Sequence, residues 1–313
     1  MPVEIPSTRY SGTIKEIKLG KGEKSVTIGG ETSYPFFLHE GTMPHKPRIA
    51  MEVWDTVPED WPAAAIKPFK DVLENPVAWA KKCIQTYGAD MIALQLISID
   101  PNGLNRGPEE ASALVKKVAD AIDVPLMVWG VANHEKDTAV LTKVAEVCRD
   151  KKLILGPVEE KDYKIIGAAA IACQHTIAAS SPIDINLAKQ LNILLGNLGV
   201  PDGAILMDPT VSGIGYGLEY AYSVMERMRT AALTQQDEKL QYPIICNLSK
   251  EVWKSKEIQQ PDDAQFMGNA EKRGILLEAM SAMALLEAGG DVIVMRHPEA
   301  VKLIKEMISE LIA

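Results

Sequence analysis

The amino-acid sequence predicts an α/β fold, a (β/α)8 TIM barrel with an N-terminal β-hairpin extension. Between Arg48 and His297, a short apolar run, a polar break and an amphipathic helical stretch follow one another eight times. Strands that alternate with helices indicate a parallel sheet, because parallel neighbours must be joined by a long crossover. Eight such units in about 250 residues are what this barrel requires. Its functional groups then lie on the loops that follow the strands.

The apolar runs are the predicted strands. They lie at Ile49–Val53, Met91–Ile99, Leu126–Trp129, Leu153–Leu155, Thr176–Ala179, Ala204–Met207, Pro243–Cys246 and Val292–Met295. The predicted helices cover residues 76–87, 108–122, 137–149, 163–173, 184–198, 217–234, 270–288 and 298–312. Capping residues mark several helix starts: Asn75 precedes a proline at a first helical position, and Glu109 and Glu110 place negative charge in a first turn.

Residues 1–45 differ in pattern from the rest of the chain. Thr13–Leu19 and Ser25–Ile28 predict a β-hairpin, joined by a Gly- and Lys-containing turn and ended by Gly29-Gly30. Because a lone hairpin is marginal in water, we expect it to close the bottom of the barrel or to dock on another protein. The predicted division is therefore an N-terminal extension over 1–45 and a barrel over 46–313.

The long loop Pro58–Pro76, rich in Pro and Trp, is typical of functional loops.

Composition argues against several classes of partner. The net charge of −9 disfavours nucleic acid and anionic membranes. The four cysteines form no CxxC pair, so neither a zinc site nor an iron–sulfur cluster is expected on this chain. The N-terminus lacks the basic and apolar regions of a signal peptide, and no apolar stretch is long enough to span a membrane. We therefore expect a cytoplasmic protein.

The residues that follow the strands form the candidate site. In chain order they are Asp55, Thr56, Asp100, Asn102, Asn105, Gly130, Asn133, His134, Gly156, Ser180, Ser181, Asp184, Asp208, Thr210, Ser212, Asn247, Ser249, Arg296 and His297. This set is rich in amides and hydroxyls, and the last two loops lack the glycines of a phosphate site. No HExxH or GxSxG pattern occurs, so no catalytic and no metal-binding residue is predicted. A barrel opening lined by such residues suits the binding of a large amide-bearing molecule or of the face of another protein.

Simpler structural roles are open for part of this set. Asp100-Pro101-Asn102-Gly103 is an ideal turn sequence, and His297 could cap the last helix. Ser180 and Ser181 could belong to an ordinary polar loop. Asp208 is the strongest candidate, because a buried aspartate at a barrel mouth must be hydrogen-bonded or shifted in pKa.

Several short motifs resemble those of a known family. They are Val26–Thr32, Pro35-Phe36, His39-Glu40-Gly41, Glu59-Asp60-Trp61-Pro62, Asp71-Val72, Tyr87–Ile92 and Ala288-Gly289-Gly290-Asp291. In these segments, and along its whole length, the chain resembles the small (delta) subunit of the corrinoid/iron–sulfur protein of the acetyl-CoA pathway, the counterpart of the decarbonylase/synthase delta subunit. The hairpin extension strengthens the resemblance, because it is not a general feature of barrels.

The resemblance implies a heterodimeric methyl carrier. A larger subunit would carry a four-iron (4Fe-4S) cluster and a corrinoid, a cobalamin-type cofactor that lies at the interface with this barrel. The corrinoid would take a methyl group from methyltetrahydrofolate on a separate methyltransferase and deliver it to acetyl-CoA synthase. We expect the cofactor-facing residues to be Asp100, Asn102, Asn133, Ser180, Ser181, Asp208, Asn247 and His297.

Two alternatives remain open. The barrel is also similar to pterin-binding methyltransferases and dihydropteroate synthases, in which an aspartate ends strand six and an asparagine ends strand seven. Asp208 and Asn247 stand at those positions, so the chain could itself be a free-standing methyltetrahydrofolate methyltransferase. It could also be a scaffold whose mouth is covered by protein and touches no cofactor. The sequence leaves open the lower base of the corrinoid, and whether the donor is folate or an archaeal pterin.

Overall fold

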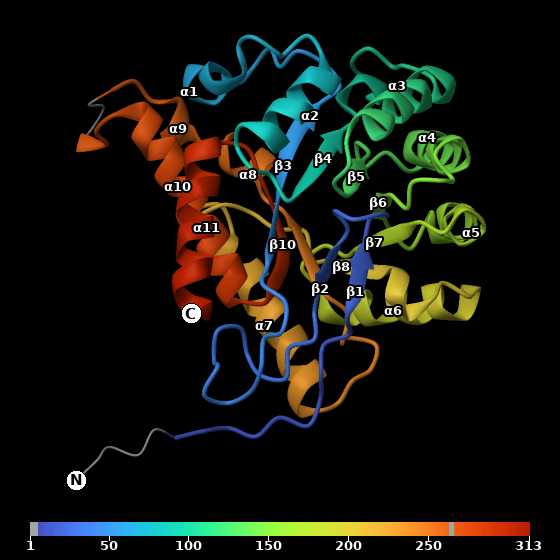
Figure 1. Ribbon diagram of the computed structural model, residues 1–313, viewed down its shortest axis with the longest axis vertical. Coiled ribbons are helices and arrows are strands. Elements are labelled where there is room, and N and C mark those ends of the chain that lie inside the picture. Colours follow the sequence, from blue (N-terminus) through green and yellow to red (C-terminus); the bar gives the residue numbers. More distant parts are fainter. Residues whose placement is uncertain (1–5, 263–265) are drawn as a thin grey trace.

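Eight parallel strands close into a barrel in the computed structural model, which describes residues 6–262 and 266–313 (Figure 1). The strands are β3 (Arg48–Trp54), β4 (Met91–Gln95), β5 (Leu126–Trp129), β6 (Ile154–Val158), β7 (Thr176–Ser180), β8 (Ile205–Asp208), β9 (Ile244–Asn247) and β10 (Gly290–Met295). Each pairs with the next along the chain, and β10 closes the ring by pairing with β3. The predicted fold class is therefore confirmed.

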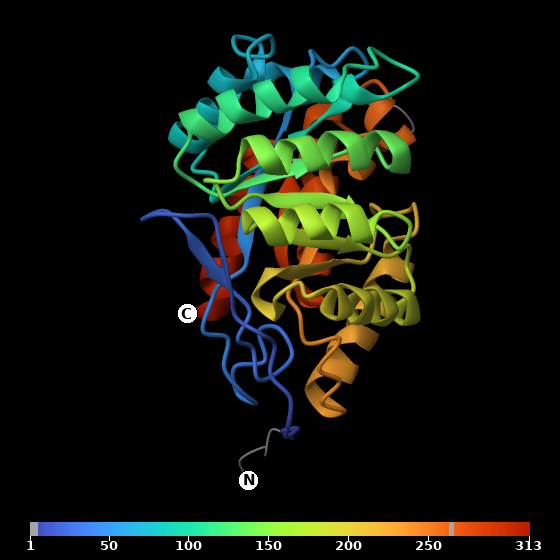
Figure 2. The same cartoon turned by 90° about the vertical axis from the view of Figure 1, so that its right-hand side faces the viewer.

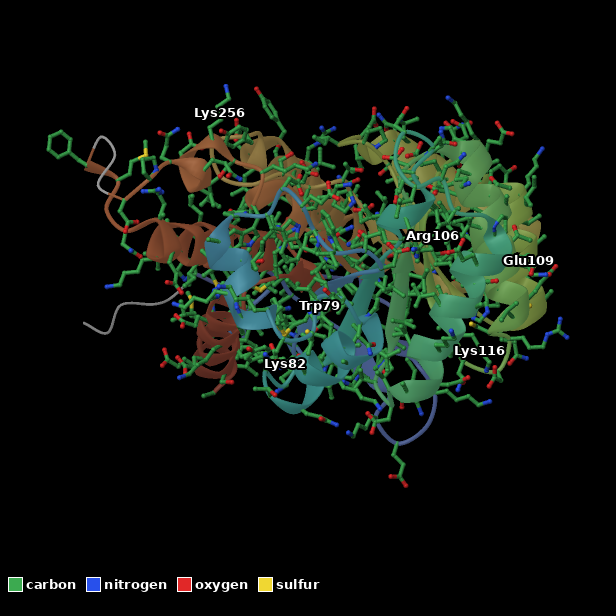
Figure 3. All side chains as sticks on the ribbon, turned by 90° about the horizontal axis from the view of Figure 1, so that it is seen from above. Trp79, Lys82, Arg106, Glu109, Lys116 and Lys256 are labelled. Carbon is green, nitrogen blue, oxygen red and sulfur yellow. The ribbon has the colours of Figure 1, made fainter. Side chains whose placement is uncertain are left out.

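A ring of helices covers the outside of the barrel. These helices are α2 (Pro76–Gln85), α3 (Pro108–Ala121), α4 (His134–Val147), α5 (Tyr163–Cys173), α6 (Ile185–Leu198), α7 (Leu218–Thr234), α10 (Ala270–Glu287) and α11 (Pro298–Ile312), close to the predicted ranges. Figure 2 shows α3 to α6 stacked side by side along one flank. Their inner faces meet the strands: Trp79 on α2 is fully buried, whereas Lys82 and Lys116 project at the periphery (Figure 3). None of the described helices combines the length and apolar character that a membrane crossing demands.

Short helices that the sequence did not predict lie in two of the loops after strands. They are α1 (Ala63–Ile66), α8 (Ser249–Val252) and α9 (Lys256–Gln259). Each is a single turn without a long apolar period, so sequence patterning gives no signal for it. All three lie at the carboxyl end of the barrel, which we call the mouth.

The hairpin closes the opposite end of the barrel, the floor. Strands β1 (Ile17–Leu19) and β2 (Val26–Ile28) pair antiparallel, and their buried aliphatic side chains pack on the inward-facing residues of the barrel. Those inward residues are Ala50, Met91, Ala93, Met127, Trp129, Ile154, Ala178, Leu206, Ile245, Val292 and Val294. A lone hairpin has no apolar surface to pack against, and the inward-facing residues of the barrel supply one here. This is as expected for an element that closes the bottom of the barrel.

The second strand is shorter than predicted. The apolar run Met91–Ile99 suggested one strand, but β4 ends at Gln95 and Ile97–Ile99 form a 3-10 turn. The carboxylate of Asp55, at the end of β3, accepts hydrogen bonds from the backbone N–H (2.9 Å) and the hydroxyl of Ser98. These bonds hold the 3-10 turn in place. The apolar run Met91–Ile99 gives no sign of this contact with Asp55, so the strand was predicted too long.

Candidate functional site

Polar side chains form a layer inside the barrel at its mouth, directly above the apolar interior. Side chains alternate between the two faces of a strand, so the inward series that includes Ala93, Ala178 and Leu206 continues to Gln95, Ser180 and Asp208. Gln95 Nε2 lies 3.0 Å from Asn247 Oδ1. Because β4 and β9 are not neighbours in the barrel, this hydrogen bond crosses its interior.

Asp208 is the central ionisable group of this layer. It stands opposite Ser180 in the parallel register, and the Ser180 hydroxyl donates to Asp208 Oδ2 at 2.7 Å. The Thr210 backbone N–H donates to the other carboxylate oxygen at 3.0 Å. Burial nevertheless raises the pKa of Asp208 to about 6, because two hydrogen bonds do not replace the lost hydration. Near neutral pH this carboxyl group can therefore either donate or accept a proton.

A pocket of about 310 Å³ opens above this layer, and we call it the mouth pocket. Gln95, Ser180, Asp208 and Asn247 line it. Trp129 and Pro157 supply apolar wall, and Lys250 and Glu251 also line it. An acid, two amides and a hydroxyl beside an aromatic ring can recognise a polar group that carries both hydrogen-bond donors and acceptors.

The other half of the mouth is closed by a buried ion pair. Arg296 Nε lies 2.7 Å from Glu52 Oε2, and both side chains are almost inaccessible to solvent. The Trp54 indole donates to the other Glu52 oxygen at 2.9 Å. The Arg296 guanidinium stacks on Trp61, 3.6 Å from the ring centroid. The loop Pro58–Pro76, predicted to be functional, thus contributes the tryptophan that covers this pair.

The sequence-predicted residues divide into two groups. Ser180, Asp208 and Asn247 line the mouth pocket. Ser180 and Ser181 also line an adjacent hollow of about 170 Å³ beside α6. These three strand-end positions and Ser181 therefore come together in space.

The remaining predicted residues have local structural roles. Asp100 accepts from the Asn102 backbone N–H at 2.8 Å in an exposed turn. Asn133 caps α4, accepting from Lys136 N at 3.1 Å, and His297 caps α11 through Nδ1, 3.2 Å from Glu299 N. The turn at Asp100 and the cap by His297 match the simpler alternatives noted from the sequence, whereas the cap by Asn133 was not predicted. Cofactor contact by these four residues stays a prediction.

Sequence reasoning missed several contributors to the mouth, among them Gln95, Trp129 and Glu52. Gln95 lies within the apolar run of the second strand, and Glu52 lies within that of the first. Strict alternation of side chains along each strand was the available signal, because it places both residues on the inner face. As for metals, the part of the chain that the structure describes brings together no group of three or more His, Cys, Asp or Glu residues suited to an ion.

Comparison with known proteins adds the family relationship. A family model described as the CO dehydrogenase/acetyl-CoA synthase delta subunit matches residues 16–310. The acetyl-CoA decarbonylase/synthase complex subunit delta of Archaeoglobus fulgidus is 36% identical over 315 residues, which cover 96% of this chain and 69% of the relative. The subunit of the same name from Methanopyrus kandleri is 34% identical, covering 97% of this chain and 73% of the relative.

Solved structures show a similar barrel. A dihydropteroate synthase from Xanthomonas albilineans with 4-aminobenzoic acid gives a TM-score of 0.58 at 11% identity, covering 89% of this chain and 97% of that one. A dihydropteroate synthase from Coxiella burnetii in complex with pteroic acid gives a TM-score of 0.57 at 11% identity, with coverage of 87% and 96%. At such low identity these matches support the barrel fold alone.

Proposed function

This chain belongs to the CO dehydrogenase/acetyl-CoA synthase delta-subunit family, and from that premise we propose that it is the barrel subunit of a corrinoid/iron–sulfur methyl carrier. In this proposal the chain pairs with a larger subunit that holds the iron–sulfur cluster, and its mouth covers the corrinoid. The carrier works between a methyltetrahydrofolate methyltransferase and acetyl-CoA synthase. The observation that carries the proposal is the amide- and hydroxyl-lined mouth, which suits a ligand whose rim bears amide groups.

The mouth residues fit such a ligand in their chemistry. The hydroxyl oxygens of Ser181 and Ser249 are buried and have no hydrogen-bond partner among the described residues. Ser180, Asp208 and Asn247, which line the mouth pocket, and Ser181, which lines the adjacent hollow, offer donors and acceptors for amide groups. When bound, the corrinoid supplies a cobalt centre that accepts and releases a methyl group.

The size of the mouth pocket indicates how the chain would act. The mouth pocket, at about 310 Å³, lies at the lower end of the range for pockets that bind drug-sized ligands. A corrinoid is several times larger than such a ligand. The barrel would therefore cover the cofactor as a cap and would not enclose it. Its part in the reaction is to bind the rim, exclude water and present a surface over which partner enzymes alternate.

An anaerobic reconstitution tests this proposal. The chain is co-purified with the larger subunit, and bound corrinoid is measured by absorbance per heterodimer. Asn247→Ala should lower corrinoid retention or methyl-transfer rate at least several-fold. Asn197→Ala, on the exposed side of α6, is the matched control and should change neither quantity. A homo-oligomer that neither pairs with the larger subunit nor retains corrinoid would overturn the proposal.

One observation favours a second candidate, a pterin-dependent methyltransferase. Asp208 and Asn247 line the same pocket, whose volume suits a bicyclic heterocycle, and the pKa of the acid is near 6. Strand β5 ends in Trp129, and Glu159, directly after β6 (Ile154–Val158), lines the same pocket as a further acid. Binding of methyltetrahydrofolate by the chain alone, lost in Asp208→Ala, would support this second candidate.

A further inference from the structure

A second cavity lies at the floor of the barrel, at the end opposite the mouth pocket. It has a volume of about 390 Å³ and is formed by the hairpin loop, the ends of α4 and α5, and the segment between α6 and β8. Ala170, Ile171, Cys173 and Val200 give it an apolar wall. Lys21, Arg149 and Lys152 also line it. We call it the floor cavity.

Within residues 6–262 and 266–313, none of these three cations forms an ion pair with a carboxylate. Lys21 Nζ donates to the carbonyl of Asp150 at 3.3 Å and Lys152 Nζ to that of Lys18 at 2.6 Å. Arg149 Nε donates to a carbonyl of its own helix at 3.4 Å. Each contact is with a neutral carbonyl oxygen, so no carboxylate among the described residues neutralises these positive charges.

The one acid that lines the cavity is engaged elsewhere. Asp150 pairs with Lys116 at 3.2 Å and with Lys151 at 3.7 Å, both outside the cavity. The floor cavity is therefore locally cationic on a chain whose net charge is −9.

Lys152 is the only one of the three cations that is partly buried, since Lys21 and Arg149 are exposed to solvent. Burial lowers its pKa, and the nearby charge of Lys18 lowers it further. A bound anion would relieve both effects, since an opposite charge favours the protonated amine.

We propose that the floor cavity binds a small amphipathic anion, an aliphatic or aromatic carboxylate. The apolar body of the ligand packs on Ala170, Ile171 and Val200, and its carboxylate meets Lys152 with Arg149 and Lys21 nearby. A volume near 390 Å³ is in the range of small-molecule sites. This site lies at the other end of the barrel from the mouth, and the inference does not depend on the proposed function.

Competition with a fluorescent probe tests the inference on the full chain. Anilinonaphthalene sulfonate, an aromatic anion that fluoresces in apolar surroundings, is bound first and then displaced with octanoate. Octanol, which has the same chain without the charge, is the ligand control. We expect octanoate to displace the probe and octanol to be at least tenfold weaker, because charge-assisted hydrogen bonds supply that difference.

Two variants then locate the site. Lys152→Gln removes the central charge and should weaken octanoate binding about tenfold. Gly203→Phe should fill the cavity, because Gly203 lines it and a Cβ added there meets no atom within 4 Å. Lys117→Gln, on the exposed face of α3, is the matched charge control and should bind octanoate as the native chain does.

The outcomes decide the proposal in either direction. Weaker binding in both Lys152→Gln and Gly203→Phe, with Lys117→Gln unchanged, supports the floor cavity. If Lys152→Gln binds octanoate as tightly as Lys117→Gln, the proposal is wrong. Should Gly203→Phe fail to fold by circular dichroism, Arg149→Gln replaces it, and its affinity must fall below that of Lys117→Gln.

Discussion

Gln95 and Asn247 hydrogen-bond across the barrel, with 3.0 Å between Nε2 and Oδ1, although they lie on strands that are not neighbours. Gln95 is buried, and Asn247 is only partly accessible beneath the mouth pocket. The contact links two sides of the ring directly at the site. It gives the polar layer a fixed arrangement before any ligand binds.

The first prediction concerns the energy of this contact. Gln95→Ala and Asn247→Ala should each lower the free energy of unfolding by about 1 kcal/mol or more. Because the two side chains bond to each other, the double variant should lose less than the sum, with a coupling energy of about 0.5–1.5 kcal/mol. Urea unfolding of the four proteins measures this coupling. Strict additivity would mean that the bond contributes nothing to stability.

The second prediction is a pH dependence set by Asp208. Its pKa is raised from 3.8 to about 6 by burial, so the native state holds the proton more tightly than the unfolded state. The contribution of this group is therefore fully present below about pH 4 and is lost as the pH rises through 6. Asp208→Asn removes this dependence, so it should gain stability relative to the native chain by about 2–3 kcal/mol between pH 4 and 7.

Urea unfolding of both proteins at pH 4 and pH 7 checks this difference, because all other titrating groups cancel. Ser181→Ala, a neighbouring change without an ionisable group, should show no such pH-dependent gain. A difference between Asp208→Asn and the native chain that stays constant with pH would show that the Asp208 pKa is not raised.

The sequence was sufficient for most of the fold, because each strand–helix unit carries its own apolar period and its own capping residues. Ser180, Asp208 and Asn247 were found for a related reason, since parallel strands bring their carboxyl ends to one edge. The missing parts depend on contacts between distant segments. Glu52 and Arg296 are 244 residues apart. Glu278, on α10, accepts from the backbone N–H groups of Arg296 and His297 at 2.5 and 2.9 Å, and no local pattern announces that contact.

The third prediction tests the buried ion pair of the mouth. Arg296→Met leaves the Glu52 carboxylate buried without its cation and should cost about 3–5 kcal/mol. Adding Glu52→Gln should recover much of the loss, since a neutral amide can still accept from the Trp54 indole. Lys82→Met breaks the pair with the largely exposed Asp71 and should cost less than about 1 kcal/mol. Equal losses for Arg296→Met and Lys82→Met in urea unfolding would contradict this account.

The fourth prediction compares two glycines of the floor hairpin. Gly29 and Gly22 have φ of +84° and +86°, a region that costs a side chain about 1–2 kcal/mol. At Gly29 an added Cβ would also lie 2.1 Å from the carbonyl oxygen of Lys15, whereas at Gly22 it meets no atom within 4 Å.

Gly29→Ala should therefore destabilise the chain clearly more than Gly22→Ala, which isolates the backbone cost. Because β1 and β2 cover the apolar interior of the barrel, the lost stability should appear in one cooperative unfolding transition. Urea unfolding followed by tryptophan fluorescence gives both values. Equal losses in the two variants would show that the chain relieves the clash by shifting Lys15. A separate early transition in Gly29→Ala would show instead that the hairpin detaches while the barrel remains folded.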